Sequence, residues 1–161
     1  MRFQRHTVAW LTAFFGLAGL AWWWLAAPTH SPLHIEASAQ GQVLVFQRSG
    51  SGHYRWRGTL GGVPTEFLVD TGAVRTTIPK TLAEQAGLQL VEQTTFSTAS
   101  GEVQGGIAVA PLVLQGGVQL SALRVAVIPG MGTDALLGMD VLARLKLEMS
   151  GNEMRVTLPT P

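Results

Sequence analysis

The stretch "FLVDTGA", Phe67 to Ala73, places an acid directly after a run of apolar residues that is typical of a buried strand. An isolated ionised carboxylate in an apolar setting is so unfavourable that it normally pairs or takes up a proton. The residues that follow Asp70 are small, namely Thr71, Gly72 and Ala73, and they leave room for a bulky group to approach. The stretch therefore predicts a functional site at the end of a strand.

Short apolar stretches separated by glycine turns fill the chain from Val43 onward. "HYRWRGTL" alternates between apolar and polar residues, and the "GG" pair at 61–62 predicts a tight turn into "VPTEFLVD". The alternation shifts phase between Leu120 and Leu123, which predicts a β-bulge. Two segments predict short helices, 79–88 and 139–145. The pattern favours a mainly β fold, either a small closed barrel or a Greek-key barrel.

The N-terminal segment 1–27 predicts a membrane anchor. "TVAWLTAFFGLAGLAWWWLAA", Thr7 to Ala27, holds no charged residue and is long enough to cross a hydrocarbon core of about 30 Å. Arg2 and Arg5 precede it, which indicates a single pass through a bacterial inner membrane with the N-terminus cytoplasmic and the rest periplasmic. The alternative is a signal peptide cleaved near "ASA", residues 37–39, which would release a soluble periplasmic protein.

Residues 28–42 are rich in Pro, Ser, Ala and Gln and predict a linker, followed by one folded domain over 43–161. His30 and His34 have the spacing of a helical metal pair, but Pro32 between them argues against a helix. We therefore expect no metal site and no cofactor.

Composition narrows the classes of function. The net charge is +1 and no basic stripe carries interleaved aromatic residues, so a nucleic-acid partner is not expected. The chain has no cysteine, which excludes disulfides, thiolate catalysis and cysteine-based zinc sites.

Asp70 allows three interpretations: a turn or helix-cap aspartate, a metal ligand, or a catalytic carboxylate. No acid or histidine is spaced nearby for a metal site. The context favours the third interpretation. About 66 residues downstream, "LLG" at 136–138 also leads into a short helix, and "TASGEV" at 98–103 lies between the two segments. Both segments run from apolar residues through a glycine into a short helix, and this short similarity suggests that the domain consists of two related halves.

This combination resembles the pepsin-like and retroviral aspartic proteases, in particular the single-domain retropepsin-like proteases of the bacterial membrane-anchored branch. The resemblance covers about residues 52 to 158. It implies a small closed β-barrel of the retropepsin type with one or two short helices, and a flap hairpin at "TASGEV".

The resemblance also implies a mechanism. The chain carries one Asp-Thr-Gly motif, so two copies would form a homodimer in which the two Asp70 carboxylates share one proton and hydrolyse a peptide bond. By position, Thr71 would hydrogen-bond across the twofold axis and Gly72 would let the peptide approach. The residues expected to contact the peptide are Ala73, Val74, Arg75, Ala99, Ser100 and Gly101.

The sequence departs from the retroviral pattern where Val74 and Arg75 replace acids that bind the substrate backbone. A guanidinium at the cleft wall would favour acidic peptide side chains. The alternative is that Arg75 points to solvent or pairs with a nearby acid. Asp134 and Asp140 are not followed by Thr/Ser-Gly, and Asp140 fits a helix first turn, where the dipole favours an acid.

A second class of function stays open at this point. The same fold could serve as a binding or assembly module at the membrane with little or no peptidase activity. The intact Asp-Thr-Gly favours the enzyme, because a binding module has no need to bury a pair of acids.

Overall fold

The computed structural model describes residues 33–38, 41–98 and 101–158. The predicted membrane anchor at 1–27 lies outside these ranges. Within them no helix combines the length and apolar character that a membrane crossing requires. The strands are β1 Leu33–Ser38, β2 Gly41–Gln47, β3 Arg55–Leu60, β4 Val63–Val69, β5 Thr77–Pro79, β6 Leu90–Thr98, β7 Gly101–Leu114, β8 Gln119–Ile128, β9 Ala135–Leu137, β10 Lys146–Ser150 and β11 Glu153–Thr157, and the helices are α2 Lys80–Gln85 and α3 Met139–Leu142.

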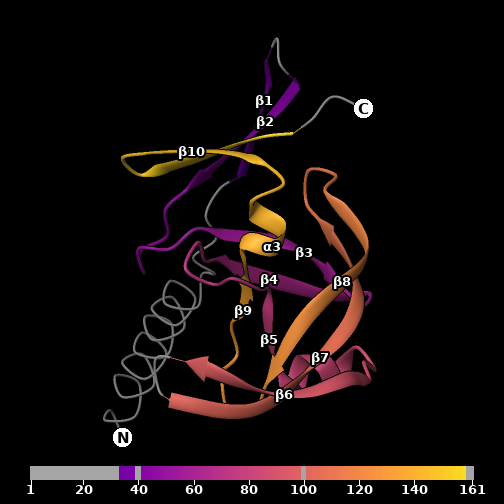
Figure 1. The fold of residues 1–161 in the computed structure, drawn as a ribbon. Coiled ribbons are helices and arrows are strands. Elements are labelled where there is room, and N and C mark those ends of the chain that lie inside the picture. Colours follow the sequence, from indigo (N-terminus) through magenta and orange to yellow (C-terminus); the bar gives the residue numbers. More distant parts are fainter. Residues whose placement is uncertain (1–32, 39–40, 99–100, 159–161) are drawn as a thin grey trace, which may run out of the picture. The chain divides into compact units, whose positions relative to one another are not determined.

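Six strands close into a barrel, which confirms the expected mainly β architecture (Figure 1). The order β3-β4-β9-β5-β8-β7 returns to its start because β7 also pairs with β3, through Gly58↔Leu114, Thr59↔Val113 and Leu60↔Leu112. β6 extends the wall by pairing with β7 as a long antiparallel hairpin. Closure leaves the barrel strands without open edges.

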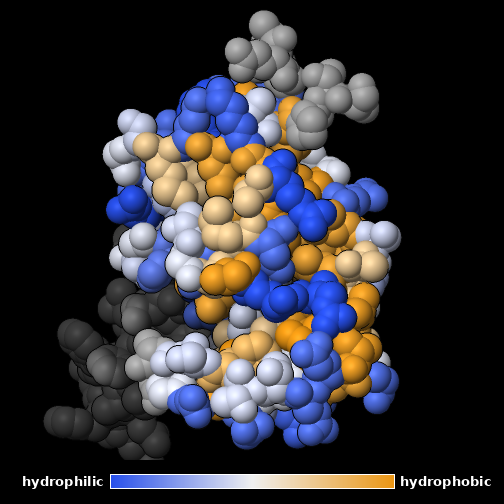
Figure 2. Space-filling model, in the orientation of Figure 1, coloured by the Kyte–Doolittle hydropathy of each residue, from blue (hydrophilic) through white to orange (hydrophobic). Residues whose placement is uncertain are grey.

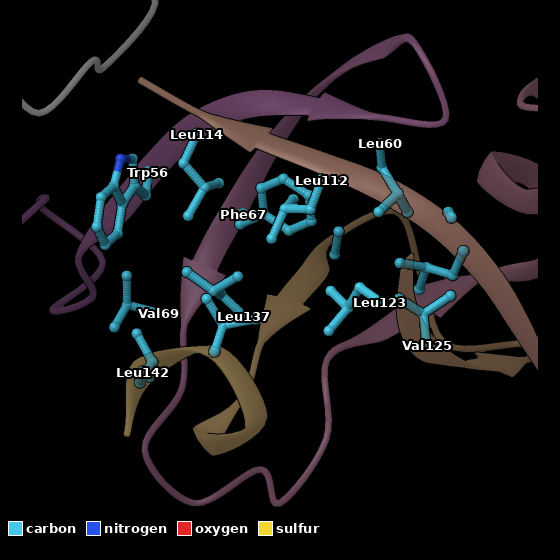
Figure 3. Close-up of a cluster of buried hydrophobic side chains, with 14 of the residues drawn as sticks. Trp56, Leu60, Phe67, Val69, Leu112, Leu114, Leu123, Val125, Leu137 and Leu142 are labelled. Carbon is cyan, nitrogen blue, oxygen red and sulfur yellow. The ribbon is translucent and has the colours of Figure 1, made fainter. Parts of the chain in front are cut away.

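The barrel interior is filled by side chains that alternate inward along each strand (Figure 3). Along β7, Ala108, Ala110, Leu112 and Leu114 are buried, whereas the residues between them are exposed. The largest fully buried side chain is Trp56, whose Nε1 donates a hydrogen bond to the Gln115 carbonyl at 2.8 Å. Its polar atom is therefore satisfied inside an apolar core.

The chain order around β9 creates the loop that holds Asp70. β9 lies between β4 and β5, parallel to β4 through Val69↔Leu137 and antiparallel to β5 through Thr77↔Leu136. The chain leaves the barrel after Val69, makes a loop over residues 70–76, and re-enters as β5 on the far side of β9. The loop must therefore pass around the end of β9.

A second sheet of four strands, β1-β2-β11-β10, packs beside the barrel. Phe46 of β2 meets Trp56 of β3 with ring centroids 4.9 Å apart. Within the predicted linker 28–42, residues 33–38 form β1, which pairs with β2 from Leu33↔Phe46 to Ser38↔Gly41. Its Pro- and Ser-rich composition concealed this pairing, whose partner is the apolar run at Val43–Phe46.

Figure 2 shows that apolar side chains reach the surface in small patches between polar ones on the face that it displays. The large apolar residues that are most exposed in the described ranges include Val74, which is 84% exposed in the loop after Asp70. Isolated exposed apolar residues are common on protein surfaces. Val74 differs because it also lines the cleft described below.

Candidate active site

Asp70 is the first residue beyond the end of β4, and hydrogen bonds to the neighbouring strand fix its backbone. Its amide donates to the Leu137 carbonyl at 3.1 Å, continuing the pairing of β4 with β9. Its carbonyl accepts a hydrogen bond from the Ala73 amide at 3.3 Å, which turns the chain immediately. The acid thus lies at the edge of a closed barrel, on rigid elements of the kind that hold catalytic groups in place.

The Asp70 side chain is partly buried and its Oδ1 accepts a hydrogen bond from the Gly72 amide at 2.8 Å. This is the local side-chain turn that Asp-Thr-Gly favours. A Cβ added at Gly72 would lie 3.2 Å from Asp70 Oδ1, so glycine keeps this side of the carboxylate open. Asp70 can therefore form the turn and still present its carboxylate to a ligand.

Hydrogen bonds from Gly138 and the first turn of α3 hold the loop 70–76 in place. The Thr76 amide and hydroxyl both donate to Asp140 Oδ1, at 2.9 and 2.8 Å, and the Thr76 hydroxyl accepts from the Gly138 amide at 3.2 Å. The amides of Met139 and Asp140 donate to the carbonyls of Ala73 and Val74 at 2.8 and 3.2 Å. Asp140 lies in the first turn of α3 as expected, and its carboxylate also orders the loop.

Replacing Asp140 by Ala is expected to lower the free energy of unfolding by about 2 kcal/mol, because it leaves the fully buried Thr76 with two unsatisfied donors. The matched control is Asp134→Ala, which removes an ion pair between Arg55 and an exposed acid and is expected to cost less than about 1 kcal/mol. Urea unfolding of both variants measures the difference. Equal losses would contradict the role of Asp140 in holding the loop.

A cleft of about 830 Å³ opens over Asp70, between the loop and the β6–β7 hairpin. Asp70, Gly72, Ala73, Val74 and Arg75 all line it. Thr71 is exposed and is not among the lining residues, and neither is the exposed Gly101. The remaining two predicted contacts, Ala99 and Ser100, lie outside the described residues.

Most of the apolar cleft wall was not predicted from the sequence. It comes from the hairpin, where Phe96 and Val103 are directly paired across β6 and β7, and from Ile128, Met131 and Leu136 on the opposite side. Two signals could have indicated it. Phe96 and Val103 lie three positions before and three positions after the pair 99–100, and "VIPGM" ends a buried strand on a turn, as "FLVDTG" does.

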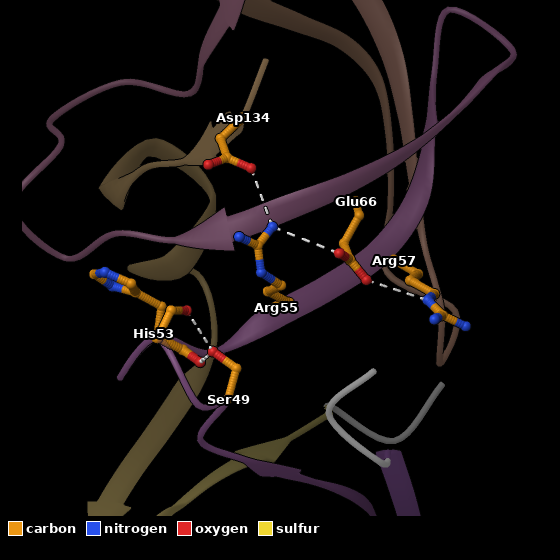
Figure 4. Close-up of polar contacts among 7 residues, drawn as sticks. Ser49, His53, Arg55, Arg57, Glu66 and Asp134 are labelled. Carbon is orange, nitrogen blue, oxygen red and sulfur yellow. Dashed lines mark hydrogen bonds and ion pairs between the residues drawn. The ribbon is translucent and has the colours of Figure 1, made fainter. Parts of the chain in front are cut away.

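The other acids near the barrel have structural partners. Asp134 accepts a hydrogen bond from Arg55 at 3.1 Å, and Glu66 contacts both Arg55 and Arg57 on the outer surface of β3 and β4 (Figure 4). Asp140 is engaged with Thr76. Among the described residues that line the cleft, Asp70 is therefore the single carboxylate.

The described polar clusters offer no competing chemistry. Ser49 Oγ donates to the backbone carbonyl of His53 at 2.7 Å, so this pair is a turn contact rather than a serine–imidazole arrangement (Figure 4). No group of three or more His, Cys, Asp or Glu residues within the described ranges is arranged to hold a metal ion.

The closed barrel, the hairpin over the cleft and the Asp-Thr-Gly loop together define a retropepsin-like aspartic protease domain. The family model for gag-polyprotein putative aspartyl protease matches residues 56–144, more than half of the chain, and the chain belongs to this family. The matched range includes the whole loop 70–76 and the segment that fixes it.

One solved structure shows the same fold, and a second is reported beside it. A retropepsin-like aspartic protease from Rickettsia conorii is 23% identical, with a TM-score of 0.59 over 70% of this chain and 97% of that one. EIAV protease, solved with an inhibitor, is 16% identical, with a TM-score of 0.48 over 73% of this chain and 90% of that one.

A curated relative also matches. An uncharacterized protein of Rickettsia prowazekii is 31% identical over 121 residues, which is 71% of this chain. The aligned part spans 50% of the length of that relative.

Proposed function

We propose that the chain is an aspartic endopeptidase that hydrolyses peptide bonds at a site shared by two copies. The observation that carries this proposal is the position of Asp70, whose Oδ1 is held by the Gly72 amide at 2.8 Å in a cleft of about 830 Å³. Membership of an aspartyl protease family supports it. The small residues beside Asp70 leave space for an extended peptide backbone.

The requirement for two copies follows from the count of acids. Peptide hydrolysis by carboxylates needs one charged group to activate water and one protonated group to polarise the carbonyl. The described lining of the cleft contains one carboxylate, and Asp134 and Asp140 are engaged elsewhere. A homodimer with Asp70 of each copy near the twofold axis supplies the second.

In the proposed mechanism, two Asp70 carboxylates about 3 Å apart share one proton, because both cannot ionise at that separation. The charged member takes a proton from a bound water as the water attacks the scissile carbonyl. The protonated member transfers its proton to the carbonyl oxygen, so that a neutral tetrahedral diol forms without a covalent enzyme intermediate. The carboxyl that took the proton from water then gives it to the amine nitrogen, while the other carboxylate takes a proton from a diol hydroxyl. The C–N bond breaks, and the pair again holds one proton.

Thr71 is the residue on the loop that we propose to stabilise the pair. It is exposed in the single chain and lies outside the cleft lining, a location compatible with contact to a second copy. The apolar segment Thr7 to Ala27 supports a further proposal, that the domain is tethered to the bacterial inner membrane and works in the periplasm.

The direct test is cleavage profiling of the full chain on a diverse peptide mixture, with products identified by mass spectrometry. We expect cuts at internal peptide bonds within a restricted set of sequences. A chain that binds peptides yet produces no cut at any pH from acidic to neutral would overturn the enzyme proposal in favour of a binding module.

The pH profile of cleavage is expected to be bell-shaped and centred at acidic to near-neutral pH. Activity falls on the alkaline side because the pair loses its shared proton, and on the acidic side because both carboxylates become protonated. A substrate without ionisable side chains isolates this effect, and circular dichroism at each pH checks that the fold persists. A rate that rises steadily to about pH 9 would contradict a carboxylate pair.

A further inference from the structure

Arg75 is a cationic side chain in the wall of the same cleft that contains Asp70. Its Nη1 donates to the Arg124 carbonyl at 3.3 Å, near the upper limit for a hydrogen bond. Among the described residues the ion pairs of the domain do not involve Arg75. A guanidinium carries five N–H donors, so most of its capacity for hydrogen bonds is unused in the described part of the chain.

The contact that Arg75 makes is with a backbone carbonyl and not with an acid. The nearest strand contact is Arg124, whose own guanidinium is paired with Glu92 Oε2 at 2.7 Å. Glu92 is therefore already engaged. The expectation that Arg75 pairs with a neighbouring acid is not what the structure shows.

The backbone of Arg75 is held firmly, so its side chain extends from a fixed point. The Thr77 hydroxyl donates to the Arg75 carbonyl at 2.9 Å, and Thr76, the next residue, is anchored to Asp140 through its amide and hydroxyl. A guanidinium on a rigid backbone loses less conformational freedom when it binds a carboxylate. This favours recognition over a loose surface contact.

The rest of the described cleft wall is largely apolar, with Phe96 and Val103 on the hairpin and Ile128, Met131 and Leu136 opposite. We propose that Arg75 makes the cleft select peptides that carry an aspartate or glutamate among apolar side chains close to the bond that is cut. The carboxylate would accept paired hydrogen bonds from the guanidinium, and lysine or arginine at the same place would be repelled. This inference rests on the proposed peptidase function and specifies its substrate class.

The test uses pairs of synthetic peptides that are blocked at both ends and differ only by Glu or Gln at one position. The position is moved in turn along an otherwise apolar sequence. For the wild-type full chain we expect kcat/KM for the Glu peptide to exceed that for the Gln peptide about fivefold at one position, as for a partly exposed ion pair. Added salt should reduce this ratio, because it screens the charges.

Three variants assign the ratio to its source. Arg75→Ala is expected to bring the Glu:Gln ratio of kcat/KM to about one. Arg75→Glu is expected to bring this ratio below one, and a peptide with Lys at the same position should then be cleaved faster than the Gln peptide. Each ratio is measured within one variant, so a general loss of rate does not affect it. Arg57→Ala removes a guanidinium on β3, outside the cleft lining, and should keep the wild-type ratio.

A binding measurement separates this inference from the proposed function. The affinities of the same peptides for Asp70→Asn, with and without Arg75→Ala, are measured by fluorescence anisotropy. Preferential binding of the Glu peptide that depends on Arg75, without cleavage by the wild type, would support the inference and overturn the peptidase. Cleavage with a Glu:Gln ratio of one at every position would overturn the inference alone, and neither cleavage nor a binding preference would overturn both.

Discussion

Replacing Asp70 by Asn is expected to lower kcat/KM by about a thousandfold or more, while the fold stays intact. The substitution removes both roles of the carboxylate, since an amide neither takes a proton from water nor donates an acidic one. In the wild type the Gly72 amide donates a hydrogen bond to Asp70 Oδ1 at 2.8 Å. Asparagine keeps a side-chain oxygen that can accept the same hydrogen bond. Steady-state cleavage of one defined peptide and a thermal melt measure the two effects separately.

The same variant tests whether the site is shared. If two copies supply one acid each, a dimer that contains one Asn chain lacks half of the pair. When equal amounts of wild type and Asp70→Asn exchange at random, about a quarter of the dimers keep both acids, whereas half of the chains are wild type. Activity should therefore fall to about a quarter of that of wild type alone at the same total concentration. It should also fall on dilution below the dissociation constant of the dimer.

Asp134→Asn is the matched control, because it also changes an acid to an amide within the domain, but this acid pairs with Arg55 and lies outside the described cleft lining. It should not suppress the activity of added wild-type chains. Asp70→Asn with undiminished cleavage would contradict the mechanism. Mixing that reduces activity only to about half would show that each chain acts alone, and would overturn the shared site.

Local features of the fold were predictable from the sequence because short-range chemistry determines them. The turn at 61–62 is present, and its two glycines have φ of 57° and 83°, a region that favours glycine. The bulge predicted between Leu120 and Leu123 is confirmed, since Ala110 pairs with Leu123 but Leu112 with Leu120. The two helices also occur, as α2 Lys80–Gln85 and α3 Met139–Leu142, and both are shorter than predicted.

Features that depend on distant parts of the chain were not predicted. β5 and β9 have three residues each, too short to give a periodic signal, and their parallel and antiparallel partners lie far away in the sequence. β1 was missed because its pairing with β2, rather than its own composition, makes it a strand. Closure of the barrel through β3 and β7 is likewise a nonlocal pairing.

The candidate site also has one part that a local motif indicated and another part that depends on distant pairings. Asp70 to Arg75 are contiguous, so one motif indicated the whole segment, and five of its six residues line the cleft. Phe96 and Val103 needed the register of the hairpin, and Leu136 needed the insertion of β9 between β4 and β5. The contact of Asp140 with Thr76 joins residues 64 positions apart, and no local pattern reports such a contact.

Gly138→Ala is expected to damage both the stability of the domain and the position of Asp70. A Cβ at this position would lie 2.4 Å from the carbonyl carbon of Arg75 and 2.7 Å from both the Arg75 oxygen and the Thr76 nitrogen. All three are backbone atoms of the loop that begins at Asp70, so no side-chain rotation relieves the overlap. The φ of Gly138 is −92°, which any residue adopts, and the constraint is therefore purely one of space.

The loop must move away to admit the methyl group, and the contacts that fix it move with it. These are the hydrogen bonds from Gly138 to Thr76 and from Met139 to Ala73, at 3.2 and 2.8 Å. Overpacking of this kind costs about 3 kcal/mol, which corresponds to a fall in melting temperature of about 10 °C or more. Because Asp70 begins the displaced loop, we expect cleavage to be lost even at temperatures where the variant is folded.

The control is Gly50→Ala, at an exposed position where a Cβ would have no atom within 4 Å. It should change the melting temperature and the cleavage rate little, because it adds a methyl group to open space. Differential scanning fluorimetry and the peptide assay on both variants give the comparison. If Gly138→Ala matched Gly50→Ala in both measurements, the loop would not pass as close to β9 as the structure has it. The positioning of Asp70 by the segment around Gly138 would then have to be abandoned, whereas loss of cleavage in a folded Gly138→Ala variant would show that this segment sets the geometry of the acid.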